Sequence, residues 1–233
     1  MRFGIVALIL FVLGACASTD KIAVHPKMIT VKADSIPNNE LSIIIGPYRD
    51  SLKGEMDRVV GFAPMHMMAS RPSSSLMNWV ADAVFADQTR TVRLSTPTFC
   101  LLNKGGIRST INKGEITFGD VFKLMPFDNQ IVWVQLPIEC IADIEAFIRA
   151  TGGEPIANAR VENGKLMVNG MHEGVTHFWV ITSDYLLNGG DKATFFSKRT
   201  EVNRTGRLVR DALMSEIELV GTVIADSTVR ITF

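Results

Sequence analysis

The sequence predicts a layered domain of the α+β class, in which helices and strands alternate along the chain. Segments with apolar residues at helical spacing are interleaved with short β-rich runs. Apolar residues make up 47% of the 233 positions, which is sufficient for a sizeable core. We find no internal repeat and no low-complexity tract in the sequence.

The N-terminus carries a targeting segment. Arg2 precedes an apolar run, residues 3–12, that is too short to span a bilayer as a stable anchor. The run ends in Leu13-Gly14-Ala15-Cys16, which is similar to a bacterial lipobox, where the cysteine is acylated and becomes the new N-terminus. An ordinary signal peptide with a chance cysteine is the alternative.

We therefore expect a signal peptide over residues 1–15, a polar tether over residues 16–41 and a folded domain over residues 42–233. Acyl chains on Cys16 would hold the protein at a membrane surface, because each buried methylene contributes about 0.8 kcal/mol. The predicted location is that of a lipoprotein in the bacterial cell envelope, facing the periplasm.

Charge and cysteine content narrow the classes of function. Basic and acidic residues balance at 24 each, and no basic stripe stands out, so nucleic acid is not an expected partner. Cys100 and Cys140 both lie in apolar contexts, which favours buried free thiols over a disulfide.

Two helices are expected at the start of the domain. The first begins at Pro47, since proline suits the first helical position, and ends at Gly61. Its apolar stripe consists of Leu52, Met56 and Val59. The second helix is capped by the serines of residues 73–75, and its buried face consists of Leu76, Val80, Ala83, Val84 and Phe85.

Strands dominate the middle of the chain. A buried strand over residues 98–102 leads into a glycine turn, and residues 116–124 form a strand end followed by a short helix. Residues 131–136 are a further β-rich run. Residues 137–148 then form a helix that begins at its proline and is stopped by Gly152-Gly153.

The C-terminal part begins with a hairpin, because Asn163-Gly164 lies between two strand-like runs. Residues 177–182 form a buried strand that leads into a second glycine turn. A helix is expected over residues 205–219, and a strand over residues 229–232 closes the chain.

The first glycine turn, Asn103-Lys104-Gly105-Gly106-Ile107-Arg108, presents polar groups. Its glycine pair lets the backbone approach a ligand closely and leaves Asn103 and Arg108 on opposite sides of a bend. Arg108 can hold a phosphate with two hydrogen bonds, and Asn103 can donate and accept toward a base or a ribose. A strand-to-helix turn with a surface arginine is the alternative, because short glycine motifs are common.

The second turn is Gly189-Gly190-Asp191, whose aspartate can accept from two ribose hydroxyls or bond its own backbone. Tyr185 and Phe127 lie beside the two turns and can stack on a base, a contact worth about 1–3 kcal/mol. A core position is the alternative for each ring, although Pro126 and Asp128-Asn129 place Phe127 on a loop. Together these groups suit a ligand with an anionic part, hydroxyls and a flat ring, such as a nucleotide.

The order and spacing of the motifs resemble the C-terminal domain of the 5′-nucleotidase family, which includes bacterial UDP-sugar hydrolase/5′-nucleotidases and animal ecto-5′-nucleotidase. The matching segments are Asn-x-Gly-Gly-Ile-Arg, Gly119-Asp120, Pro126-Phe127-x-Asn129, Gly-Gly-Asp, Arg230-Ile231 and a helix, residues 76–83, similar to the family's Leu-Gly-Asn-x-x-x-Asp-Ala element. The resemblance covers residues 42–233 and implies a layered α/β/β/α domain of that type.

The resemblance also implies roles in binding the nucleoside part of a substrate. Phe127 and Tyr185 would sandwich the base, with Tyr185 replacing a usual phenylalanine. The remaining implied contacts are Asn103 with the base or ribose, Asp191 with the ribose hydroxyls and Arg108 with the phosphate side, while Gly105, Gly106, Gly189 and Gly190 form the turns. The family also has an arginine a few residues before the helix element, and Arg71 is the nearest match to it. Lys192 stands where the family often has glycine and Met77 where it has glycine, and either side chain would narrow the binding site.

In the family, hydrolysis belongs to a separate N-terminal metallophosphoesterase domain, which holds two metal ions with Asp-x-His and Gly-Asn-His motifs. Neither motif occurs in this sequence, and its four histidines are scattered. The resemblance therefore implies no catalytic residue, metal site or cofactor in this chain, with divalent metals on a partner domain.

Two functions follow, with a third disfavoured. The chain is expected to be the nucleotide-binding half of a hydrolase in nucleotide catabolism, acting with a separate metallophosphoesterase. The alternative is a non-catalytic nucleotide- or nucleoside-binding lipoprotein. A self-sufficient hydrolase is disfavoured by the missing metal motifs. The expected partners are a nucleotide or nucleoside, that metallophosphoesterase, and a membrane reached through the lipid.

Overall fold

The computed structural model describes residues 40–224 and 226–233. The predicted signal peptide, lipidation at Cys16 and all but the end of the predicted tether lie outside these residues. Residues Ile44–Phe233 form one compact unit. Among the described helices, none combines the length and the apolar character needed to span a bilayer.

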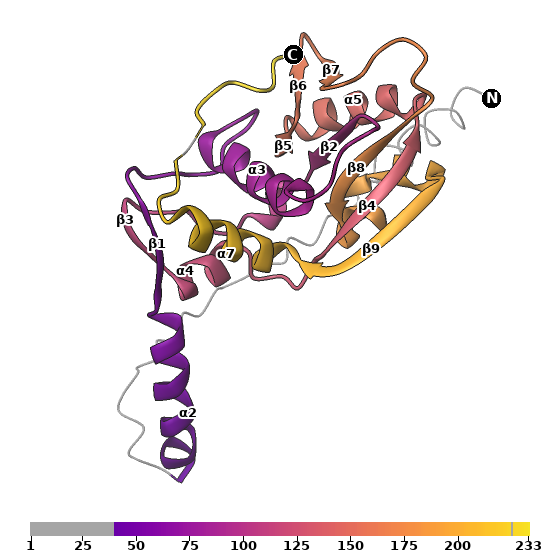
Figure 1. The fold of residues 1–233 in the computed structure, drawn as a ribbon. Helices are drawn as coiled ribbons and strands as arrows, with labels where there is room; N and C mark the ends of the chain where they lie inside the picture. The colour runs from indigo at the N-terminus through magenta and orange to yellow at the C-terminus, as the bar shows by residue number, and fades with distance from the viewer. Residues whose placement is uncertain (1–39, 225) are drawn as a thin grey trace, which may run out of the picture. The chain divides into compact units, whose positions relative to one another are not determined.

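Helices and strands alternate through the chain (Figure 1). The helices are α2 (Glu40–Met56), α3 (Ser75–Thr89), α4 (Phe118–Leu124), α5 (Cys140–Thr151), α6 (Asp184–Leu187) and α7 (Val209–Val220). The strands are β1 (Val59–Ala63), β2 (Thr98–Leu101), β3 (Gly114–Thr117), β4 (Gln130–Pro137), β5 (Ile156–Ala157), β6 (Ala159–Glu162), β7 (Lys165–Val168), β8 (His177–Ser183) and β9 (Glu201–Leu208). Short 3-10 helices are η1 (Lys104–Gly106), η2 (Gly190–Lys192) and η3 (Thr194–Lys198).

A mixed five-stranded sheet in the order β5-β2-β8-β4-β9 forms the centre of the unit. Strands β2 and β8 are parallel, with Cys100 opposite Ile181, whereas β4 runs antiparallel to β8, with Ile131 opposite Ser183. Because β2 and β8 run in the same direction, their carboxyl ends meet at one end of the sheet, and β4 begins there. The loops that follow β2 and β8 and the loop that precedes β4 are therefore neighbours.

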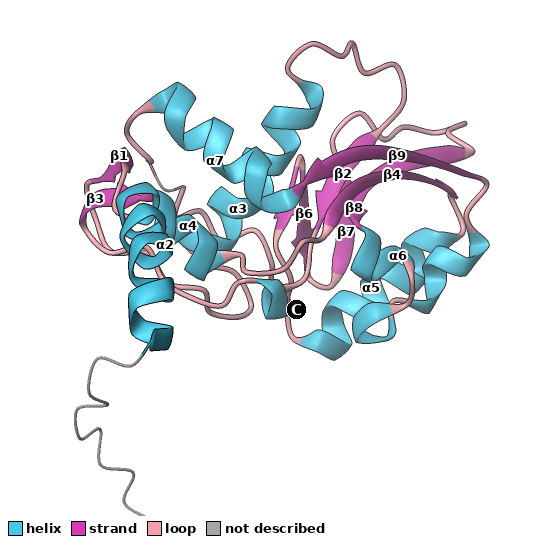
Figure 2. Cartoon of the chain, turned by 90° about the horizontal axis from the view of Figure 1, so that it is seen from below, coloured by secondary structure: helices cyan, strands magenta, loops and turns pink. Residues whose placement is uncertain are grey.

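Alternate residues of the sheet supply two separate hydrophobic cores, because successive side chains of a strand point to opposite faces. Cys100 and Ile181 pack in one core with residues of α3, α4 and α7. Phe99 and Val180 pack in the other core with residues of α5, α6 and η3. Figure 2 shows the sheet between these helices. The β1–β3 pair joins the first core and the β6–β7 hairpin joins the second, which confirms the layered α+β class.

Local signals in the sequence locate several elements correctly. Helix α3 is capped by Ser74, whose hydroxyl accepts from the backbone N–H of Met77. The hairpin of β6 and β7 turns at Asn163-Gly164, and α5 stops at Gly152, which has a φ of +78°. Strands β2, β3, β4 and β8 also lie where the sequence predicts β structure. Pro137, however, ends β4 opposite His177 instead of opening α5, which begins at Cys140.

The predicted helix from Pro47 to Gly61 is wrong at both ends. Helix α2 begins at Glu40 and continues through Pro47, which lacks the N–H for an intrahelical bond, and Leu52 is 58% exposed instead of buried. Gly61 lies inside β1, where a Cβ would come within 2.4 Å of the Ile217 side chain on α7. This glycine permits close packing and does not end a helix.

The C-terminal predictions also need correction. Residues 205–208 belong to β9, which pairs with β4 at the edge of the sheet, so α7 begins at Val209. Strand β9 escapes detection because most of its side chains are exposed and polar, so its sequence lacks apolar alternation. The predicted strand over residues 229–232 is reduced to a single bridge between Ile231 and Val161.

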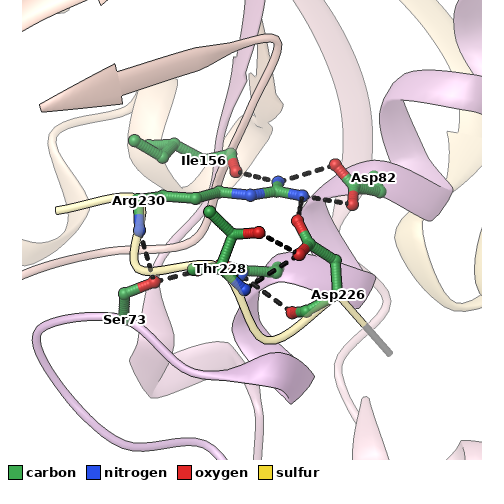
Figure 3. A network of polar contacts seen from close by, with 7 residues as sticks. Ser73, Asp82, Ile156, Asp226, Thr228 and Arg230 are labelled. Carbon is green, nitrogen blue, oxygen red and sulfur yellow. Dashed lines mark hydrogen bonds and ion pairs between the residues drawn. The ribbon is translucent and has the colours of Figure 1, made fainter. Parts of the chain in front are cut away.

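Arg230 attaches the C-terminal segment to the rest of the unit (Figure 3). Its guanidinium donates to both carboxylate oxygens of Asp82 on α3, at 2.7 and 2.6 Å, and to Asp226 at 2.6 Å. It also donates to the carbonyl oxygen of Ile156 at 2.9 Å, and its side chain is only 14% exposed. We call Asp82, Asp226 and Arg230 the Arg230 cluster.

The two described cysteines, Cys100 and Cys140, are buried and unpaired, as the sequence predicts. Burial raises the pKa of both thiols, which keeps them protonated at neutral pH. Neither is suited to act as a nucleophile.

Candidate functional site

The two glycine turns lie together at the end of the sheet where β2 and β8 finish. Strand β2 leads through Asn103 into η1, which contains the first glycine pair. Strand β8 leads into α6, where the Ser183 hydroxyl accepts from the N–H of Leu186 and caps the helix. Tyr185 therefore stands on a short helix, with the second glycine turn and Asp191 directly after it.

These segments enclose a cavity of about 300 Å³. Its lining residues come from the loop after β2, the loop before β4 and the segment after β8: Asn103, Gly105, Gly106, Arg108, Phe127, Asn129, Tyr185 and Asp191. The structure thus brings together seven residues that the sequence singled out, and adds Asn129. Gly189, Gly190 and Arg71 are not among the residues that line it.

Asp191 links the two turns through its carboxylate. One oxygen accepts from the Asn103 side-chain amide at 2.9 Å, and the other accepts from the Tyr185 hydroxyl at 3.0 Å. We call Asn103, Tyr185 and Asp191 the Asp191 cluster. The hydrogen bond to Asp191 raises the pKa of Tyr185, because it stabilises the protonated phenol. Each carboxylate oxygen keeps further acceptor capacity, since a carboxylate can accept about four hydrogen bonds.

The backbone at this point is unusual. Asp191 and Lys192 have φ angles of 50° and 66°, in the left-handed region that residues other than glycine rarely occupy. Such conformations cost about 1–3 kcal/mol each and occur preferentially at functional sites. The Asp191 carboxylate accepts hydrogen bonds from Asn103 and Tyr185, so the alternative of an aspartate that bonds its own backbone is not what the hydrogen bonds show.

Gly190 and Gly189 shape the cavity without lining it. A Cβ at Gly190 would lie 2.4 Å from Cε1 of Tyr185, so the glycine is needed for the ring to rest on the turn. Gly189 has a φ of +88° and open space around it, so its role is conformational.

The aromatic and cationic groups of the cavity are accessible. Phe127 is 45% exposed and Tyr185 is 41% exposed, so neither ring is part of the core. Arg108 is exposed, and its guanidinium donates to the Gly105 carbonyl at 3.3 Å. That contact leaves other guanidinium N–H groups available to a ligand.

Arg71 does not enter the cavity. Its guanidinium donates to the carbonyl oxygen of Gly153 at 2.9 Å and to the carboxylate of Glu154 at 2.8 Å. Glu154 has a side chain that is 1% exposed, and its second oxygen accepts from the backbone N–H of Lys104 in the first glycine turn. The Arg71–Glu154 pair therefore holds the backbone of the first glycine turn at Lys104.

The structure adds roles for two residues and corrects the expectation for Met77. Glu154 was not singled out, because nothing in the local pattern marks a buried carboxylate after a helix stop. Asn129 was named as part of the Pro126-Phe127-x-Asn129 motif but was given no binding role, although it lines the cavity. Met77 is buried in the first core and does not narrow the site. Lys192 lines a second cavity, which adjoins the first.

Across residues 40–224 and 226–233, no three side chains of His, Cys, Asp or Glu gather closely enough to hold a metal ion.

Part of the sequence matches a known family model. Residues 59–137 match the family model described as the 5′-nucleotidase C-terminal domain. Two curated proteins of Bacillus subtilis are similar: Endonuclease YhcR is 29% identical over 103 residues, and the trifunctional nucleotide phosphoesterase protein YfkN is 27% identical over 99 residues. These matches cover 43% and 40% of the chain but only 8% and 7% of the two relatives.

Solved structures show the same fold over most of the chain. The 5′-nucleotidase precursor from Thermus thermophilus superposes with a TM-score of 0.69 at 22% identity, and the NAD nucleotidase NadN of Haemophilus influenzae with a TM-score of 0.61 at 17%. Each match covers 82% of this chain and 42% or 40% of the other, so the chain spans less than half of either protein. Residues 59–137 thus match the 5′-nucleotidase C-terminal domain in sequence, and most of the chain shares the fold of these solved structures.

Proposed function

We propose that the chain binds a nucleotide or nucleoside in the cavity between the two glycine turns, as the substrate-binding half of a 5′-nucleotidase-type hydrolase. The observation that carries this proposal is the composition of one cavity, where two exposed rings, an amide, a carboxylate and an unpaired guanidinium converge. The rings of Phe127 and Tyr185 would stack on the base. Asp191 would accept from the ribose hydroxyls, and Arg108 would face the phosphate.

We further propose that hydrolysis is supplied by a metallophosphoesterase domain on another chain. The sequence contains no Asp-x-His or Gly-Asn-His motif, and the described residues offer no cluster of metal ligands. No bond-breaking step is therefore assigned to the residues of this domain. Lipidation of Cys16, which would place the protein on a membrane in the cell envelope, is part of the same proposal.

Binding is tested by titrating adenosine, AMP and UDP-glucose into the purified full chain in a calorimeter. At least one of these ligands should bind. Replacing both Phe127 and Tyr185 by alanine should weaken adenosine binding at least about tenfold, since each stacking contact contributes about 1–3 kcal/mol. Phe62→Ala is the matched control, because Phe62 is a similarly exposed ring on β1, away from the cavity lining. No binding of any ligand, or equal losses in the control, would overturn the proposal.

The proposed separation of nucleotide binding and hydrolysis between two chains has its own test. The purified chain should show no phosphatase activity with added Mn²⁺, and it should gain activity when a metallophosphoesterase domain is supplied. Activity of the pure chain that a chelator abolishes would contradict the split arrangement. If the chain binds nucleosides but no metallophosphoesterase domain confers activity, a non-catalytic binding protein is supported instead.

A further inference from the structure

We propose that a second cavity beside the first binds an anionic group carried on the 2′ or 3′ side of the ribose. The preferred ligands would then be nucleotides with anionic groups on both sides of the sugar. This inference rests on the proposed function, because it uses the placement of the ribose at Asp191.

The second cavity has a volume of about 520 Å³ and adjoins the first. Gly105 and Asp191 line both cavities, whereas Arg108 lines only the first. The cations of the second cavity are Arg71, Lys104 and Lys192, and none of these lines the first. The two cavities therefore share Gly105 and Asp191 but are lined by different cations.

This difference between the cavities assigns one side of the sugar to each of them. If Asp191 accepts from the ribose hydroxyls, the groups beyond Asp191 face the 2′ and 3′ positions. Arg108 is then left for the 5′ phosphate. A phosphate on the hydroxyl side would extend past Asp191 into the second cavity, while the remaining hydroxyl could still donate to that carboxylate.

The second cavity has cationic groups to spare, because its three cations outnumber its two carboxylates, and one of these carboxylates, Glu154, is paired with Arg71. Glu154 accepts from Arg71 and from the backbone N–H of Lys104, and Asp191 accepts from two side chains of its own cluster. The lysine ion pairs of the described chain involve Lys123, Lys165 and Lys198 only, so the ammonium groups of Lys104 and Lys192 have no carboxylate partner there. Both are free to hold a phosphate.

The backbone of Lys192 points to the same conclusion. Its φ of 66° suits glycine, which would adopt this conformation without strain. A lysine at this position is unfavourable for the turn, and its side chain lines the second cavity. The lysine is therefore better explained by a charge needed at that place than by the backbone.

The test compares 5′-AMP with adenosine 3′,5′-bisphosphate as ligands of the full chain at low ionic strength. The added phosphate should tighten binding about tenfold, as expected for at least one new charge-assisted hydrogen bond. The advantage should shrink as salt is added, because Lys192 is exposed and Lys104 is only partly buried. The measured quantity is the ratio of the two affinities, obtained by calorimetry.

Lys192→Gly and Lys104→Gln should each move this ratio toward one. The glycine variant should fold at least as stably as the wild type, since it relieves a left-handed lysine. Lys113→Gln, which removes an exposed charge that lines neither cavity, should keep the ratio. Equal affinities of the wild type for both ligands, or a ratio that neither lysine variant changes, would overturn this inference alone. If neither ligand nor adenosine binds, the proposed function fails and this inference fails with it.

Discussion

Two carboxylate-centred clusters of this domain, one around Arg230 and one around Asp191, show how similar groups serve different ends. In the Arg230 cluster a nearly buried guanidinium meets two aspartates and a backbone carbonyl, and it joins segments 148 residues apart. In the Asp191 cluster each carboxylate oxygen has one neutral donor, and the tyrosine ring and Arg108 beside it are exposed. The groups of the first cluster form hydrogen bonds within the protein, whereas the second cluster keeps acceptors and donors available to a ligand.

The same contrast separates the three arginines that sequence motifs bring to attention. Arg230 and Arg71 are committed to partners inside the domain, and each holds a distant segment in place. Among the described residues, the Arg108 guanidinium donates a hydrogen bond only to the carbonyl oxygen of the neighbouring Gly105. Residue type alone therefore does not tell a structural arginine from a binding one.

The largest expected effect is on the free energy of unfolding, and it should distinguish Arg230 from Arg108. Arg230→Gln should lower the free energy of unfolding by about 3 kcal/mol, because it leaves Asp82 and Asp226 without their cation. The value lies at the lower end of the usual range, since those side chains are 43% and 40% exposed. Arg108→Gln should change stability by less than about 0.5 kcal/mol. Urea denaturation measures both, and comparable losses in the two variants would erase the distinction.

A second prediction concerns the glycine pair that supports the Asp191 cluster. Gly190→Ala should weaken adenosine binding about tenfold, because the new methyl group overlaps the Tyr185 ring and displaces it. Gly189→Ala introduces no such overlap but places alanine at a positive φ. It should act mainly on the free energy of unfolding, by about 1–2 kcal/mol. Calorimetry and denaturation of both variants separate the effects; an unchanged affinity in Gly190→Ala would show that the ring position does not matter.

The Arg230 cluster should also be visible in the pH dependence of stability. Hydrogen bonds from Thr228 and Arg230 lower the pKa of Asp226 from 3.8 to about 2. A carboxyl whose pKa is lowered on folding stabilises the protein above pH 3.8, and this contribution is lost as the pH falls through about 2. The stability of Asp226→Asn should therefore fall less than that of the wild type in this window. Parallel urea-midpoint curves for the two proteins would contradict the assignment.

The smallest effect tests the hydrogen bond between Tyr185 and Asp191. The sequence contains two tyrosines, so a Tyr48→Phe background leaves Tyr185 as the only phenol. Ultraviolet titration should show a Tyr185 pKa above 10.0, and Asp191→Asn should lower it. Because this pKa is raised on folding, the associated stability is present below pH 10.0 and is lost as the pH rises through the folded-state pKa. An identical titration in both proteins would exclude the bond.

Sequence patterns predicted the parts of the fold that depend on neighbours in the chain. The serine cap of α3, the Asn163-Gly164 turn and the Gly152 stop of α5 each involve contacts within a few residues. Strand β9 was missed for the opposite reason. The polar residues of β9 become a strand only because the β4 backbone offers hydrogen bonds at the edge of the sheet.

The candidate site shows the same division. The motifs named seven of the residues that line the cavity, because glycine pairs, loop aromatics and polar side chains at fixed spacing are visible in the chain itself. The supporting role of Arg71 was not visible, because its partner Glu154 lies 83 residues away and is marked by no pattern. The second cavity likewise depends on Lys104 and Lys192 reaching the same place from two different turns.

By itself, the sequence determined which segments turn, which positions must be glycine and which chemical groups the turns present. Tertiary structure decided that the turns meet, because the parallel pairing of β2 with β8 brings their carboxyl ends to one end of the sheet. Tertiary structure also decided which charged side chains are paired within the protein and which remain available to a ligand. That choice depends on contacts between segments remote in the chain, and local sequence carries no information on the distances between them.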